Sequence, residues 1–251
     1  MRTLGVDMAS QPNKTGVARI TWLTDRAVVE DIDRKADDAR LDRLAAEADA
    51  IGVDAPFGWP RSFNDFLAEH RRGLLVDTAW STARRDDLRF RRTDRRVHER
   101  TGRWPLSVSS DLISIPAMRC AAFLARQRVG DRSGDGRVYE VYPAAALTIW
   151  GFSRDSYKGD QHPARTALLA ELRRRAPWLE LSAPLAERCV ASDDCLDALL
   201  AALIARAAVR GLTVRPAPDD LELAREEGWI ALPLADSLAR LMEPPLPGAP
   251  A

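Results

Sequence analysis

The stretch SDDCLDALLAALIARAAV, residues 192–209, predicts the central helix of the fold. Ser192 is a residue type that caps helices, and Asp193 and Asp194 place negative charge in the first turn. Gly211 follows the last apolar residues, at a position where helices often end. The body of the segment is apolar on nearly all sides, which is typical of a helix packed against a sheet. The stretch therefore predicts an α/β protein.

Five short apolar segments predict the strands of the sheet that this helix covers. They span residues 3–7, 17–23, 27–32, 50–54 and 137–143. The first three are separated only by turn-forming residues, which favours an antiparallel meander. Proline and glycine residues end the fourth strand after Asp54, and Pro143 ends the fifth. Residues 227–233 fit a last short strand or an edge segment.

The order of the elements favours one α/β domain at residues 1–242, interrupted by an insert at about residues 61–136. Helices are expected at residues 36–48, 109–127 and 164–175. The helix in the insert is expected to bury Leu112, Ile115, Ala122 and Leu124. The proline-rich residues 243–251 are expected to be a disordered tail.

The composition gives no global sign of a nucleic-acid or membrane partner. Lys and Arg together number 37, as do Asp and Glu, so the net charge is zero. The three cysteines form no CxxC pair, which excludes a disulfide scaffold or a zinc ribbon and suits a reducing compartment. No apolar run is long enough to cross a bilayer, and the N-terminus shows no apolar signal region. We therefore expect a cytoplasmic protein without a membrane partner.

Acidic residues stand at the edges of the most core-like segments. Asp7 ends the first strand, and Asp54 ends the fourth. Asp194 and Asp197 lie three residues apart near the start of the long helix, so they share one of its faces. In open α/β sheets the functional crevice lies beyond the carboxyl ends of the strands. If the first and fourth strands are neighbours and the helix packs across them, these four carboxylates converge.

Carboxylates this close all stay ionised only if a proton or a cation joins them. Oxygen ligands without a nearby histidine or cysteine favour Mg²⁺ or Mn²⁺ over Zn²⁺. A pair of such ions about 3.5–4 Å apart can hold the attacking water and the leaving oxygen of a phosphodiester. Glu140, in the fifth strand, is a candidate for a further ligand or for a residue that orients the water.

Each acid also has a structural interpretation. An aspartate that opens a helix commonly caps it or interacts with its dipole, which accounts for Asp193 and leaves Asp194 open. Asp7 or Asp54 alone fits the start of a turn. Asp197 lies deeper in the helix, among alanine and leucine, where an unpaired carboxylate is costly.

Seven segments of the chain read, in order, GVDMA, VDAPFGWP, RFRRTDR, YEVYP, SYKGDQHPARTALL, DDCLDALLAA and EGWIALP. As an ordered set, which spans most of the chain, they resemble the family catalogued as domain of unknown function 429. That family is described as predicted nucleases with an RNase H-like fold. The resemblance implies a mixed sheet in which three antiparallel strands are followed by parallel strands, flanked by helices.

The wider RNase H-like group includes Holliday-junction resolvases, which bind metals through acids on strand one, strand four and the last helix. By this resemblance the metal ligands are Asp7, Asp54, Asp194 and Asp197. Resolvases also carry a tyrosine–proline strand followed by a lysine before a helix, which is similar to EVYP and YK here. That similarity places Lys158 beside the scissile phosphate. Glu140 has no settled metal role in that group, and the arginine-rich insert is not a feature of resolvases.

The most charged stretch of the insert, residues 84–103, contains nine arginines and four acids. Its candidate contacts to a phosphate backbone are Arg89, Arg91, Arg92 and Arg95. The interleaved acids equally favour a solvated helix with internal ion pairs. Lysine occurs only at Lys14, Lys35 and Lys158, and its scarcity is what distinguishes Lys158 from an ordinary surface lysine.

These features predict a nuclease or phosphodiesterase that depends on Mg²⁺ or Mn²⁺ and acts on DNA or RNA. Two alternatives remain open. An actin-like phosphotransferase would share the sheet and the aspartate of strand one, although residues 7–16 hold a single glycine where such enzymes have a glycine-rich phosphate loop. A non-catalytic module that binds nucleic acid or protein would keep the fold without the reaction.

Overall fold

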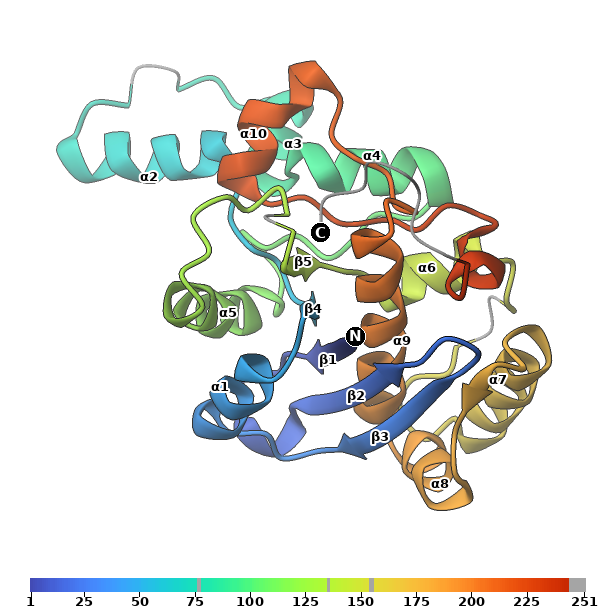
Figure 1. Cartoon of the computed structure of the whole chain (residues 1–251). Coiled ribbons are helices and arrows are strands. Elements are labelled where there is room, and N and C mark those ends of the chain that lie inside the picture. The colour runs from blue at the N-terminus through green and yellow to red at the C-terminus, as the bar shows by residue number, and fades with distance from the viewer. Residues whose placement is uncertain (76–77, 135, 154–155, 244–251) are drawn as a thin grey trace.

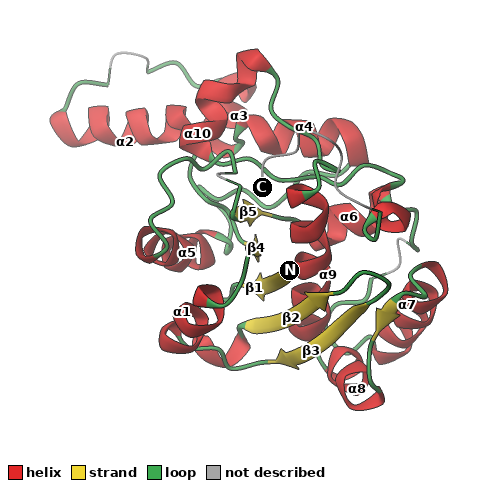
Figure 2. Ribbon diagram, viewed as in Figure 1, coloured by secondary structure: helices red, strands yellow, loops and turns green. Residues whose placement is uncertain are grey.

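The computed structural model describes residues 1–75, 78–134, 136–153 and 156–243, and it shows a six-stranded mixed sheet between two layers of helices (Figures 1 and 2). The order of the strands across the sheet is β5-β4-β1-β2-β3-β6. The strands are β1 (Arg2–Asp7), β2 (Gly16–Trp22), β3 (Ala27–Asp33), β4 (Ala50–Asp54), β5 (Val138–Glu140) and β6 (Leu179–Glu180).

The strand directions confirm the predicted fold class, an α/β protein with three antiparallel strands followed by parallel ones. Strands β1, β2 and β3 form an antiparallel meander, and β4 pairs in parallel with β1. Strand β5 in turn pairs in parallel with β4. The topology is consistent with the RNase H-like description. The two-residue strand β6, parallel to β3, was not predicted because it is too short to show a period.

Ten α-helices are found in the described part of the chain. They are α1 (Asp38–Ala46), α2 (Arg61–Arg72), α3 (Thr82–Arg89), α4 (Arg92–Thr101), α5 (Ser114–Arg126), α6 (Pro143–Ile149), α7 (His162–Arg175), α8 (Ala183–Ala191), α9 (Asp193–Val209) and α10 (Leu221–Glu227). Figure 1 shows α1 and α5 on one face of the sheet, and α9 with α6, α7 and α8 on the other. The predicted central helix is therefore α9, and it packs on the sheet as expected.

Glycines in three neighbouring strands allow α9 to lie directly against the sheet. A Cβ atom on Gly5 of β1 would overlap the carbonyl oxygen of Ala198, and one on Gly52 of β4 would overlap that of Ala201. Gly16 of β2 leaves the same space for the backbone at the start of α9. Because no side chain separates the layers at these positions, the first turns of α9 lie close to the carboxyl ends of β1 and β4.

The alternation of side chains along the strands divides the core into two parts. Leu4 and Val6 of β1 pack with Ile51 and Val53 of β4 in the layer that contains residues of α1 and α5. The intervening residues point to the other face, because successive side chains of a strand alternate. Both Asp7 and Asp54 therefore project toward α9.

The arginine-rich insert is helical, as predicted, and contains α2, α3, α4 and α5. Helices α2, α3 and α4 gather with α10 beyond the β5 edge of the sheet, whereas α5 covers one face (Figure 1). The helix expected at residues 109–127 begins only at Ser114. Residues before it form turns, in which the carboxylate of Asp111 accepts a hydrogen bond from the backbone N–H of Ser107 at 2.7 Å.

This later start changes the buried face of α5. Leu112 is 89% exposed and Ile115 is 51% exposed, and Ala122 also faces solvent, so these three expectations were wrong. Leu124 is buried as expected. The face that meets the core is formed by Ala117, Cys120, Phe123 and Leu124.

Near the C-terminus, residues 227–233 form an edge segment. Ile230 makes a single parallel bridge with Glu140 of β5, and Pro233 makes a single antiparallel bridge with Thr213. Residues 244–251 of the tail expected to be disordered lie outside the described residues. Among the residues that are described, no helix has both the length and the hydropathy needed to cross a membrane.

Candidate metal centre

Two acids of the site come from the carboxyl ends of adjacent parallel strands. Asp7 and Asp54 are each the last residue of their strand, and they are partners in the register of β1 and β4. Both side chains project to the α9 face, and both are partly accessible to solvent. The neighbourhood assumed from the sequence for the first and fourth strands is therefore present.

The third acid comes from α9. Asp197 is completely buried in the second turn of the helix. One carboxylate oxygen of Asp197 lies within 4.8 Å of one oxygen each of Asp7 and Asp54, and these two lie within the same distance of each other. Three acids that are far apart in the sequence thus form one cluster, which we call the carboxylate triad.

Burial raises the pKa of every member of the triad, and repulsion within the triad adds to this for Asp7 and Asp54. Burial and, after it, the charge of Asp197 raise the pKa of Asp54 to about 8, against the opposing charge of Lys158. The pKa of Asp7 lies well above its ordinary value because of burial and then because of the charges of Asp197 and Asp54. Burial also raises the pKa of Asp197, although its contact with Lys158 works against this. Three ionised carboxylates are therefore unfavourable here unless more positive charge is added.

Two side chains of the segment before α7 engage both oxygens of Asp197. The ammonium group of Lys158 forms an ion pair with Oδ2, and the hydroxyl of Tyr157 donates a hydrogen bond to Oδ1 at 2.7 Å. Lys158 remains about half exposed, at 51%. Its position beside the acids agrees with what the resemblance to resolvases implied for it, and differs from that of an ordinary surface lysine.

A buried arginine holds this segment in place. The guanidinium group of Arg165, in α7, donates hydrogen bonds to the carbonyl oxygens of Tyr157 at 2.6 Å and of Gly159 at 2.7 Å. It also donates to the carbonyl oxygen of Val190 at 2.7 Å, and the residue is 1% exposed. Arg165 thereby fixes the backbone on both sides of Lys158.

Asp194, predicted as a metal ligand, lies apart from the triad. Its carboxylate pairs with Arg34 at 2.7 Å, and the hydroxyl of Ser192 lies 3.4 Å from the same oxygen. Ser192 occupies the N-cap position of α9 as expected, but its side chain makes no capping hydrogen bond to the backbone. Asp193 does not act as a simple cap either, because it accepts a hydrogen bond from the backbone N–H of Gly159 at 3.2 Å.

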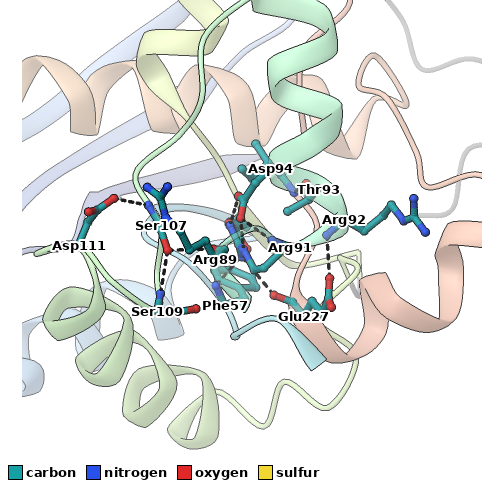
Figure 3. A network of polar contacts seen from close by, with 12 residues as sticks. Phe57, Arg89, Arg91, Arg92, Thr93, Asp94, Ser107, Ser109, Asp111 and Glu227 are labelled. Atoms are coloured by element: carbon teal, nitrogen blue, oxygen red, sulfur yellow. Dashed lines mark hydrogen bonds and ion pairs between the residues drawn. The ribbon is translucent and has the colours of Figure 1, made fainter. Parts of the chain in front are cut away.

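Glu140 lies beside the triad but is engaged by another group. Both of its oxygens accept hydrogen bonds from Arg91, at 2.7 and 2.9 Å, and the backbone N–H of Phe57 donates a further one at 3.0 Å. Arg91 also binds both carboxylate oxygens of Asp94, at 2.9 and 3.1 Å. Figure 3 shows Arg91 between Asp94 and Phe57, and Arg91 is 2% exposed. Glu140 therefore holds an arginine rather than standing free as a ligand.

The other candidate phosphate contacts in the insert also have partners. Arg92 pairs with Asp220 at 3.2 Å, and Arg95 pairs with Asp87 at 2.7 Å. The guanidinium carbon of Arg89 lies 4.8 Å from the ring centre of the following phenylalanine. These contacts agree with the alternative interpretation of the arginine-rich stretch as helices with ion pairs.

A cavity of about 400 Å³ adjoins the triad. Asp7, Asp54 and Lys158 contribute to its wall, together with Glu140 and Arg91. The rest of the wall is mostly apolar and includes Met8, Pro105, Leu106, Ile113 and Val141. A larger cavity of about 660 Å³ lies at the opposite end of the strands, near Asp49, and none of the triad lines it.

Sequence reasoning did not single out Tyr142, Tyr157 or Arg165. Tyr142 and Tyr157 line the cavity, and both lie within the quoted segments YEVYP and SYKGDQHPARTALL. Their positions next to Pro143 and Lys158 were the available signal. Arg165 gave no such signal, because a buried arginine cannot be told from a surface one in an arginine-rich chain.

The fold and the site define a class: an α/β protein with a mixed sheet and a carboxylate cluster at the carboxyl ends of two parallel strands. The chain belongs to the family described as "Protein of unknown function (DUF429)", whose model matches residues 5–222. This confirms the family resemblance, and the matched residues include the whole triad. No curated protein and no solved structure matches the chain.

Proposed function

We propose that this protein is a divalent-metal-dependent nuclease or phosphodiesterase, a hydrolase that cleaves a phosphodiester of nucleic acid. The observation that carries the proposal is the carboxylate triad. Asp7, Asp54 and Asp197 come from three distant segments, meet within 4.8 Å, and all have raised pKa values. Acids gathered in this way favour a cation, and perturbed carboxyl groups in a cavity are typical of functional sites.

The donor set fits Mg²⁺ or Mn²⁺. All three ligands are carboxylate oxygens, and in the described residues no histidine or cysteine belongs to the cluster. Ligand oxygens around one such ion are about 3–4 Å apart, given Mg–O distances of about 2.0–2.1 Å. Small side-chain rotations bring the triad from separations of up to 4.8 Å into that range. When bound, the metal would lower the pKa of a water molecule and offset the charge of the phosphodiester.

The residues of the chain have separate tasks in this proposal. Asp7 and Asp54 line the cavity, so their oxygens are placed to hold the metal and to accept a hydrogen bond from the attacking water. Tyr157 orients Asp197 through its hydrogen bond at 2.7 Å. Lys158, which is half exposed, is the cation available for a non-bridging oxygen of the phosphate.

The proposed ligand set omits two residues that the sequence suggested. Asp194 is held by Arg34, and both oxygens of Glu140 are held by Arg91. Glu140 instead positions one wall of the cavity. Arg89, Arg92 and Arg95 are likewise assigned to the packing of the insert rather than to the phosphate backbone.

The experiment that tests the function compares Asp7→Asn with Asp25→Asn on single-stranded and duplex DNA and RNA, with Mn²⁺ or with EDTA. Asp25 lies in the turn between β2 and β3, at the opposite end of the sheet, and its side chain is 73% exposed. We expect Mn²⁺-dependent cleavage by the wild-type protein and by the Asp25 variant, and none by the Asp7 variant. Cleavage that survives Asp7→Asn would remove the triad from the mechanism.

The two alternative functions have their own tests. A non-catalytic module with a relict site would show no rise in melting temperature on addition of Mn²⁺. An actin-like phosphotransferase would be stabilised by ATP. We keep the cytoplasmic location within this proposal, since all three cysteines are free and buried, as suits a reducing compartment.

A further inference from the structure

The cavity beside the triad is small and has two chemically different parts. Asp7, Asp54 and Lys158 form a charged part, whereas most of the remaining wall is apolar. Its volume of about 400 Å³ is near the lower end of the range of cavities that enclose a small organic molecule. A phosphodiester that reaches Asp7 and Asp54 must therefore bring one adjoining group into this space.

The apolar wall is partly made by the segment that follows α4. Pro105, Leu106 and Ile113 come from this segment, and Tyr142, the residue before α6, lines the same cavity. Leu106 is 60% exposed although it is a large apolar residue next to a cavity. An aromatic ring with neighbouring aliphatic side chains is a surface on which a planar base can stack.

Lys158 lines the same cavity as Tyr142. The pKa of Tyr142 is raised, first by burial and then by the charge of Asp54, while the charges of Lys158 and Arg103 lower it. These two cations therefore lie close enough to the phenol to act on it. A phosphate over the acids would lie near the cation of Lys158, and a base against Tyr142 would meet an aromatic ring.

The charged groups near the cavity do not favour binding of a duplex. Affinity for a duplex comes largely from Lys and Arg side chains that neutralise its phosphates. In the nearby insert, Arg91, Arg92 and Arg95 are already paired with acids of the protein, and Arg91 is buried. A duplex would also have to deliver a stacked and paired nucleotide into a cavity that has room for one unit.

We propose that the cavity binds one unpaired nucleotide unit, with its phosphodiester over Asp7 and Asp54 and its base against Tyr142 and Leu106. This inference rests on the proposed function and names its substrate class: a nucleoside phosphodiester that is not in a duplex. It is either a free small nucleotide or an unpaired nucleotide of a single strand. Hydrolysis forms a bond from the water oxygen to phosphorus and breaks one phosphorus–oxygen ester bond. The leaving oxygen takes up a proton, and the water loses one.

The test measures binding separately from cleavage. Full-length protein in Mn²⁺ is titrated with thymidine 5′-monophosphate, with a phosphorothioate single strand of about ten nucleotides, and with the same sequence as a duplex. We expect both unpaired probes to bind, and the duplex to bind at least about tenfold more weakly. Leu106→Ala and Tyr142→Ala are expected to weaken binding of the unpaired probes by about tenfold, as loss of a stacking surface does.

Leu74→Ala is the matched control, because Leu74 is 59% exposed, does not line the cavity, and should leave binding unchanged. The melting temperature of Tyr142→Ala, compared with that of the wild type, guards against misfolding of the alanine variant. Duplex binding as tight as single-strand binding, or a Leu106→Ala protein that binds like Leu74→Ala, would overturn the inference.

The outcomes also separate this inference from the function on which it rests. Loss of cleavage with Asp7→Asn, together with equal binding of duplex and single strand, would support the nuclease function and contradict the proposed substrate class. Binding of the unpaired probes without any Mn²⁺-dependent cleavage would contradict the nuclease function and support the preference for an unpaired nucleotide. Rates on thymidine 5′-p-nitrophenyl phosphate and on a natural single strand then show which of the two sources is preferred, and either preference supports the inference.

Discussion

Asp7 and Asp54 face each other across β1 and β4 as register partners, and each is the last residue of its strand. Like charges directly opposite on neighbouring strands are destabilising. Here a third carboxylate, that of Asp197, is added from α9, and only Lys158 is seen in an ion pair with the triad in the described residues. The arrangement of acids at the carboxyl edge of the sheet is therefore compatible with a bound cation.

The first prediction concerns pH. The pKa of Asp54 is raised to about 8 in the folded protein, chiefly by burial, whereas the pKa of an aspartate in an unfolded chain is about 3.9. The folded state binds this proton more tightly, so the contribution of Asp54 to the free energy of unfolding is fully present below about pH 4. It is lost as the pH rises through about 8. Urea unfolding in EDTA across this range should show stability falling with pH.

Asp54→Asn removes the titrating group and should make that fall shallower, while Asp25→Asn should keep the wild-type slope. Asp7 and Asp197, whose pKa values are also raised, contribute to the slope that remains. An Asp54→Asn protein with an undiminished pH slope would show that the carboxyl of Asp54 titrates normally.

The second prediction concerns Lys158. Its ammonium pairs with Asp197, so Lys158→Met leaves the triad without that positive charge. The metal-free variant should have a lower melting temperature than the wild type at about pH 8 in EDTA. Adding Mn²⁺ should raise its melting temperature more than that of the wild type, because the ion supplies charge that the wild type already has in part. A ligand present at a hundred times its Kd adds about 2.7 kcal/mol to the free energy of unfolding.

Lys14→Met is the control, because Lys14 is exposed in the short helix Pro12–Lys14 and should leave both melting temperatures unchanged. Equal Mn²⁺ shifts for Lys158→Met and the wild type would mean that the lysine does not contribute to the charge balance of the triad.

Much of the fold follows from short-range patterns. The apolar residues 198–209 predict a helix that packs against a sheet. Alternation and turn residues are sufficient to locate the strand ends at Asp7 and Asp54. That β1 and β4 are neighbours was an assumption, which the glycines at Gly5 and Gly52 support in retrospect. Both remove a side chain just where α9 crosses the sheet.

The parts of the site that could not be predicted depend on long-range partners. Asp194 and Asp197 share a helix face, so both were predicted as ligands, and the sequence does not reveal that Arg34, after β3, pairs with Asp194. Arg91 belongs to a run of charged residues that looks exposed, yet Glu140 and Asp94 hold it in the interior. Tertiary contacts determine which of these charged residues are paired or buried, and the spacing of residues along the chain does not reveal those contacts.

The third prediction concerns the packing of α9. Gly5→Ala places a Cβ atom against the carbonyl oxygen of Ala198 and the backbone nitrogen of Ala202, and neither can rotate away. Overpacking of a core costs about 1–3 kcal/mol, and a clash with helix backbone should reach or exceed the upper end. Urea unfolding and soluble yield measure the loss.

Gly130→Ala is the matched control, since nothing lies within 4 Å of the Cβ atom that it adds. It should be neutral, or stabilising by up to about 1 kcal/mol through the unfolded state. Equal stability of the two variants would contradict the direct contact between α9 and the sheet.

The fourth prediction concerns the buried ion-pair network. Arg91→Met leaves the carboxylates of Glu140 and Asp94 buried without their cation, which should cost about 3–5 kcal/mol of unfolding free energy. Arg95→Met is the control in the same helix. Arg95 pairs with Asp87 at the surface, where such a pair contributes about 0–1 kcal/mol. Adding Glu140→Gln to Arg91→Met should restore part of the loss, because it removes one of the two stranded charges. If Arg91→Met and Arg95→Met unfold at the same urea concentration, Arg91 is solvated, and the wall of the cavity that Glu140 forms is not held by this pair.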